Sequence, residues 1–192
     1  MNNTRVTDAL ALRAMASAFD AQRGKLPVEG DPHRSPDGVT VARQISELGK
    51  LITDLGNDVL FRTADHGQEA HTSRVIDGFA SAVRPAGEAA SALGTVVHEL
   101  SFLDRTEHLR DLPDARDAQE AATQVIGESL ETADRVLHDA ANSLHIAAEA
   151  VSPPSARLQA ARRQSTIATS TSSPAPTPAA AAAPAARTAR SR

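Results

Sequence analysis

The chain contains no cysteine, no tryptophan and no tyrosine, and its only aromatic residues are four phenylalanines. Without cysteine it can form neither disulfides nor thiolate metal sites. The shortage of aromatic side chains argues against single-strand nucleic-acid binding by base stacking, and it also disfavours β-strands. No uninterrupted apolar run approaches the roughly 18–20 residues of a membrane-spanning helix. These absences favour a soluble helical protein.

The N-terminus and the composition lead to expectations about location and origin. Asp8 and Arg13 interrupt the segment that would have to be apolar in a secretory signal, so we expect a cytoplasmic protein. Arginine outnumbers lysine by eighteen to two, and alanine and proline are abundant. That bias is what a GC-rich bacterial genome would produce, so we expect a bacterial source.

Sequence motifs of catalysis are absent as well. There is no glycine-rich phosphate loop and no G-x-S-x-G turn. His98 and Glu99 begin like the zinc motif H-E-x-x-H, but Phe102 stands where the second histidine is required. His66 and His71, five positions apart, would point about 140° apart on a helix. We therefore predict a protein that is not an enzyme and that carries no cofactor or metal ion.

The residues that are present predict helices. Alanine, the strongest helix former, supplies much of the 41% hydrophobic content. Apolar residues recur every three or four positions in four segments, which predicts helices over residues 4–23, 72–110 and 114–151 and a further helix that includes residues 41–59. Residues 24–37 are rich in proline and glycine and should form a flexible loop. Because the later connections are short, we predict an all-α helical bundle of about four helices with antiparallel neighbours.

The second predicted helix has the clearest pattern. Its apolar residues follow the 4-3-4-3-4 spacing of a heptad repeat. They form a predicted helix-packing seam: Val41, Ile45, Leu48, Ile52, Leu55 and Val59. A stripe of this kind is more often the buried face of a bundle than a homotypic coiled coil. We therefore expect the seam, with Ile52 at its middle, to be buried within the bundle, and we keep the coiled coil as the alternative.

Glycine and proline occur at informative places in the helices. Gly49 and Gly56 each cost about 1 kcal/mol relative to alanine in a helix interior. Close approach of another helix would explain that cost, and simple tolerance is the alternative. Pro85 should kink or break the third helix near Val83. Pro113, by contrast, suits the first position of the fourth helix.

A narrow polar stripe runs along the fourth helix, away from its apolar face. Its members are Asp134, His138, His145 and Glu149. The two histidines are about 10 Å apart along the helix axis, which is too far for one zinc ion to bind both. We interpret the stripe as a solvated face with side-chain pairs, and we keep a weak metal-binding or pH-sensing role as the alternative.

Charge is unevenly distributed along the chain. The formal net charge is −4, and Glu149 is the last acidic residue. The arginines beyond it are Arg157, Arg162, Arg163, Arg187, Arg190 and Arg192. From residue 152 onward the chain is mostly alanine, proline, serine, threonine and arginine, which cannot bury a core. We predict one folded unit over residues 1–151 and a disordered basic tail over 152–192.

These features favour a non-enzymatic helical interaction or structural protein that binds another helical protein or a second copy of itself. The alternative is a nucleic-acid-associated protein whose tail contacts phosphates. The tail cations that would do so are Arg162, Arg163, Arg187, Arg190 and Arg192. The acidic body disfavours this alternative, because it repels an anionic partner.

Overall fold

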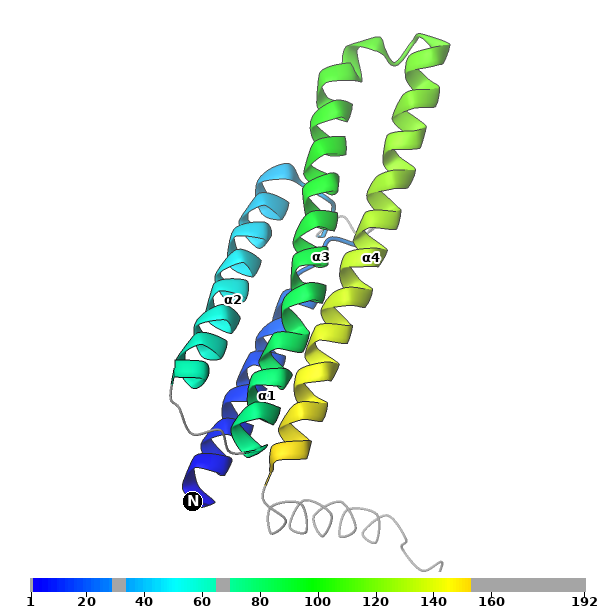
Figure 1. The fold of residues 1–192 in the computed structure, drawn as a ribbon. Coiled ribbons are helices and arrows are strands. Elements are labelled where there is room, and N and C mark those ends of the chain that lie inside the picture. Colours follow the sequence, from blue (N-terminus) through cyan, green and yellow to red (C-terminus); the bar gives the residue numbers. More distant parts are fainter. Residues whose placement is uncertain (1, 29–33, 65–69, 153–192) are drawn as a thin grey trace, which may run out of the picture. The chain divides into compact units, whose positions relative to one another are not determined.

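Four consecutive α-helices build the part of the chain that the structure describes, which is residues 2–28, 34–64 and 70–152 of a computed structural model. They are α1 (Asn2–Arg23), α2 (Gly38–Ala64), α3 (Ala70–Thr106) and α4 (Pro113–Val151), and a short 3-10 helix, η1 (Glu107–Leu109), follows α3. Within these residues there is no β-strand. The helices run alternately up and down the bundle (Figure 1), so the prediction of an all-α bundle of four helices is confirmed.

The ends of the helices follow local chemistry. Asp37 precedes α2, and its carboxylate accepts hydrogen bonds from the backbone N–H of Thr40 (2.8 Å) and from the Thr40 hydroxyl (2.6 Å). This contact is an N-cap. The hydroxyl contact first, and the backbone contact second, hold the pKa of Asp37 below its ordinary value. At the start of α4, Pro113 takes the first-turn position that its fixed backbone angle suits.

The predicted break at Pro85 is wrong. α3 is one continuous helix from Ala70 to Thr106 with Pro85 inside it. Ala82 and Ala86, on either side of the proline, are fully buried in the core. Packing of a buried face contributes more to helix stability than local propensity does, and it keeps the helix continuous here. The third helix also ends earlier than predicted, because residues 107–109 form the 3-10 turn.

The core is built from leucine, valine and alanine, together with Phe19 and Phe79. α3 and α4 share the most extensive helix–helix interface, while α1 packs mainly on α4 and α2 mainly on α3. The tightest approach is at Gly78, where a Cβ atom would lie 2.7 Å from the Cβ of Ala147 and 3.2 Å from a methyl group of Leu12. Glycine therefore lets α3 approach α4 and α1 closely.

The helix-packing seam of α2 faces the interior. Val41, Leu48 and Leu55 are fully buried, whereas the other seam residues, Ile45, Ile52 and Val59, are half-buried and pack against the core. Gln44, which is not a seam residue, is also buried. Its side-chain amide donates a hydrogen bond to the backbone carbonyl of Gln22 at 2.9 Å. The line of deepest burial is thus displaced from the middle of the seam, which leaves Ile52 half-buried rather than buried.

Candidate interaction surfaces

The polar stripe of α4 forms the edge of the α1–α4 interface. Its ion pairs with α1 are Asp134–Arg23, His145–Asp20 and Glu149–Arg13. Asp134 accepts two hydrogen bonds from the Arg23 guanidinium, at 2.8 and 3.1 Å, and they raise the pKa of Arg23. His138 is exposed. Three of the four stripe residues therefore contact α1 through side-chain pairs at the exposed edge of the interface.

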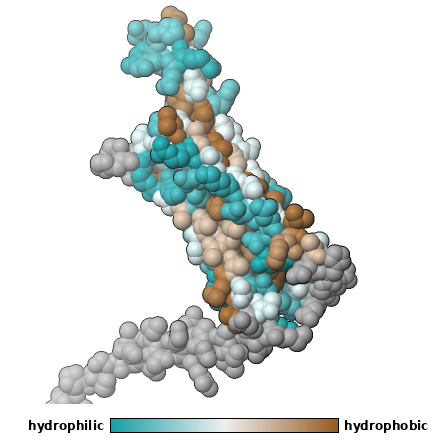
Figure 2. Space-filling view, turned by 90° about the vertical axis from the view of Figure 1, so that its left-hand side faces the viewer, coloured by the Kyte–Doolittle hydropathy of each residue, from teal (hydrophilic) through white to brown (hydrophobic). Residues whose placement is uncertain are grey.

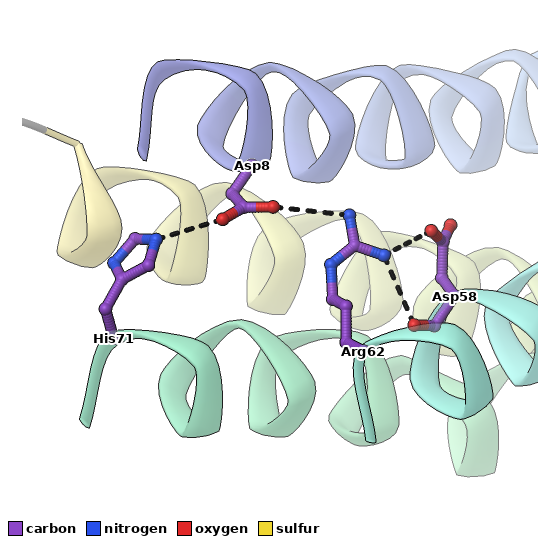
Figure 3. A network of polar contacts seen from close by, with 4 residues as sticks. All are labelled: Asp8, Asp58, Arg62 and His71. Carbon is purple, nitrogen blue, oxygen red and sulfur yellow. Dashed lines mark hydrogen bonds and ion pairs between the residues drawn. The ribbon is translucent and has the colours of Figure 1, made fainter. Parts of the chain in front are cut away.

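A second polar group connects three helices near the start of α1 (Figure 3). The His71 ring nitrogen Nε2 lies 3.0 Å from an Asp8 carboxylate oxygen, and the other oxygen of Asp8 lies 3.4 Å from an Arg62 nitrogen. Arg62 also contacts the Asp58 carboxylate and donates to the Asp58 backbone carbonyl at 3.2 Å. Its guanidinium carbon lies 4.6 Å from the centre of the Phe79 ring.

This polar group supports the fold. Asp8 comes from α1, Arg62 and Asp58 from α2, and His71 from α3. Its charged groups are mostly shielded from solvent and contact one another, and a paired buried network of this kind fixes how helices are placed relative to one another. Within residues 2–28, 34–64 and 70–152, no three histidine or carboxylate side chains lie together as metal ligands would. His66 lies outside the described residues.

On the side of α2 away from the core, a second row of residues repeats at heptad spacing and carries no charge. We call this row the α2 outer face: Ala42, Ser46, Gly49, Thr53, Gly56 and Leu60. All six residues are exposed. Figure 2 looks onto the α2 side of the molecule, where pale and hydrophobic residues interrupt the hydrophilic surface.

The glycines of the α2 outer face have no role in packing the bundle. Apart from the neighbouring residues of α2 itself, no atom in the described part of the chain lies within 4 Å of a Cβ built on Gly49 or Gly56. The predicted close approach of another helix is therefore wrong for the helices that the structure describes. Gly87 and Gly94 on α3 are equally open, but the heptad row that contains them also includes the charged Arg84. Of the two rows that contain a pair of open glycines, the one on α2 is uncharged.

Large apolar side chains lie exposed at both ends of α2. Val39 is 69% exposed near its start, and Leu60 and Phe61 are 68% and 70% exposed near its end. The sequence analysis did not single them out, because the 4-3 spacing identifies only the residues of the buried seam. The run Val59-Leu60-Phe61 was the available signal, since three consecutive apolar residues cannot all lie on one face of a helix.

A further exposed region is the end of the α3–α4 hairpin, which extends past the ends of α1 and α2 (Figure 1). We call residues 97–121 the hairpin end. Val96 and Ala122, which flank it, are buried, but no residue within it is. Its larger apolar residues are Val97, Leu100, Phe102, Leu103, Leu109 and Leu112. The hairpin end projects because α3 and α4 have 37 and 39 residues, whereas α1 and α2 have 22 and 27. The unequal lengths of the predicted helices could have indicated this projection.

Similarity to known proteins does not indicate a function for this chain. No family model, no curated protein and no solved structure matches the chain. None of the described helices combines the length and apolar character needed to cross a membrane. The predicted tail cations lie beyond Ser152, outside the described residues.

Proposed function

We propose that this protein is a non-enzymatic helical interaction module, and that its α2 outer face binds a helix of a partner chain. The partner is either another helical protein or a second copy. The observation that supports the proposal is the uncharged outer face, with its two open glycines and with Leu60 and Phe61 exposed at one end.

Energetics favour a partner at this face. The solvent side of an amphipathic helix normally carries charged and polar residues. Burying a side chain such as Leu60 or Phe61 contributes about 1.5–3 kcal/mol relative to leaving it in water. Gly49 and Gly56 together cost about 2 kcal/mol of helix stability relative to alanine, and they would allow the backbone of a second helix to approach closely.

Site-specific photo-crosslinking in the cells that make the protein tests this proposal. A photoreactive amino acid replaces Thr53, at the middle of the outer face, and in a control chain it replaces Asn142, which is exposed on α4. We expect a defined adduct from position 53 only, weakened when Leu60 and Phe61 are both changed to Glu. An adduct of twice the chain's 20.1 kDa mass identifies a second copy. Equal adducts from both positions, or none from position 53, would contradict the proposal.

A second candidate function rests on the charge of the C-terminal residues. Six arginines and no acidic residue follow Glu149, and a cationic segment of this kind binds phosphates without regard to base sequence. The remainder of the chain is acidic, which opposes association with nucleic acid. The interaction module is therefore the favoured proposal.

A further inference from the structure

The hairpin end combines apolar side chains that are half-buried, or exposed in the case of Leu112, with an excess of negative charge. It contains seven acidic and three basic residues, a formal net charge of −4 with histidine neutral. A groove of about 440 Å³ lies between the end of α3 and the start of α4. Its lining residues include three acidic and two basic side chains and are Leu103, Asp104, Glu107, Arg110, Asp111, Arg116 and Gln119.

Most of the acidic groups at the hairpin end are not used by the fold. Glu107 pairs with Arg110, and Glu99 lies 3.9 Å from His98. The carboxylates without a salt bridge to the described residues are Asp104, Asp111, Asp114, Asp117 and Glu120. The helix dipole favours Asp114, the acidic residue in the first turn of α4. Asp104 and Glu120 gain no such stabilisation, because neither lies near the N-terminus of a helix. Their charge remains available to a partner.

The apolar residues at the hairpin end are only partly buried, for a geometric reason. Leu100 and Leu103 continue the spacing of the buried residues Leu93 and Val96, and they contact the edge of the core. α1 and α2 do not extend far enough to cover them (Figure 1). A helix placed there would continue the bundle that α1 and α2 complete lower down.

Charge selects the occupant of this site. A second copy would bring a hairpin end with the same net charge of −4, and nucleic acid and anionic membranes are also negative, so all three are repelled. The chain's own C-terminal residues are basic, but they contain only two large apolar side chains, Leu158 and Ile167, in the forty residues that follow Ser152, which is fewer than the apolar face of an amphipathic helix carries. A basic amphipathic helix of another protein supplies both the cations and the apolar side chains.

We infer that the hairpin end is a docking site for a basic amphipathic helix of another protein. Leucine-like side chains of that helix pack on Leu100 and Leu103, and its Lys or Arg side chains face Asp104, Asp111 and Glu120. This surface is separate from the α2 outer face, so either surface can bind its partner if the other does not.

Binding of synthetic peptides to the full-length chain tests the inference. The probe is an 18-residue helix with leucine on one face and lysine elsewhere, and the control peptide has glutamate in place of every lysine. We expect the lysine peptide to bind at near-physiological salt and the glutamate peptide not to bind. Changing Asp104 and Asp111 to Lys should weaken binding by about tenfold or more. Changing Asp54 and Asp77 to Lys, an equal charge change on exposed positions of the body, should have little effect.

Hydrogen exchange locates the peptide on the chain. Protection should fall within residues 97–121. Equal weakening by the two charge-reversed variants, binding of the glutamate peptide, or protection confined to other helices would each overturn the inference. If changing all six arginines that follow Glu149 to Gln tightens peptide binding, the chain's own C-terminal residues already occupy the site, and the assignment to another protein is wrong.

Discussion

Glycine has opposite consequences at two positions in this fold. At Gly78 a methyl group would lie 2.7 Å from the Cβ of Ala147, and overpacking of this kind costs about 1–3 kcal/mol. At Gly49 the same methyl group enters open space, where it contributes about 1 kcal/mol of helix propensity. We predict that Gly78→Ala destabilises the protein and that Gly49→Ala stabilises it in urea unfolding. Equal stabilisation by both would show that α3 does not approach its neighbours so closely.

The N-cap of α2 makes stability depend on pH. Hydrogen bonds from Thr40 hold the pKa of Asp37 below its ordinary 3.8. A lowered folded-state pKa stabilises the protein above the unfolded-state value, and that contribution is lost as the pH falls through the folded-state value. Asp37→Asn keeps a capping side chain but removes the titration. We predict that wild type melts above the variant at pH 6 and that the gap closes below about pH 3.8. A gap that does not change with pH would contradict this assignment.

At the scale of the element, the residues of the predicted α2 seam are buried to different depths. Leu48 is fully buried, whereas Ile52 is half-buried at the edge of the core. Leu48→Ala should cost about 2–5 kcal/mol, the usual range for a fully buried leucine. Ile52→Ala should cost clearly less, because part of its side chain stays in water. Urea unfolding of both variants checks this order, and a larger loss at Ile52 would place the centre of burial in the middle of the seam.

At the scale of the whole molecule, the described helices form one compact unit. Ser152 is the C-cap residue of α4, the last helix of that unit. It is buried, and its hydroxyl donates a hydrogen bond to the backbone carbonyl of Ala148 at 2.7 Å. We therefore predict that deleting residues 153–192 leaves stability nearly unchanged in a thermal melt. A fall in Tm of more than about 5 °C, on the order of 1 kcal/mol for a chain of this size, would show that the deleted residues contribute to the fold.

The uneven charge of the molecule leads to a prediction about nucleic acid. Any binding of duplex DNA should be weak and independent of base sequence, and should fall steeply with salt. It should disappear when Arg162, Arg163, Arg187, Arg190 and Arg192 become Gln. We expect no binding at physiological salt in an electrophoretic mobility assay, because the acidic body opposes it. Binding that survives the five changes would place a nucleic-acid site elsewhere on the chain.

The sequence by itself determined the number and type of the helices and the approximate positions of most of their ends, although it placed the end of α3 too late. These features depend on local chemistry: apolar spacing of 3-4, and a Pro that suits the first turn of α4. Each of these signals is contained within a few turns of chain, so no knowledge of the tertiary structure was needed to read it.

Tertiary structure alone decided the features that need two helices at once. Pro85 lies in a continuous helix because the residues before and after it in α3, Ala82 and Ala86, are packed in the core. The point of close approach is at Gly78 and not at Gly49 or Gly56. The sequence could not show this, because the pattern of a single helix does not reveal which of its faces meets a neighbour. The candidate surfaces follow the same rule: a face is available for binding only if no other helix covers it, and coverage is a property of the assembled bundle.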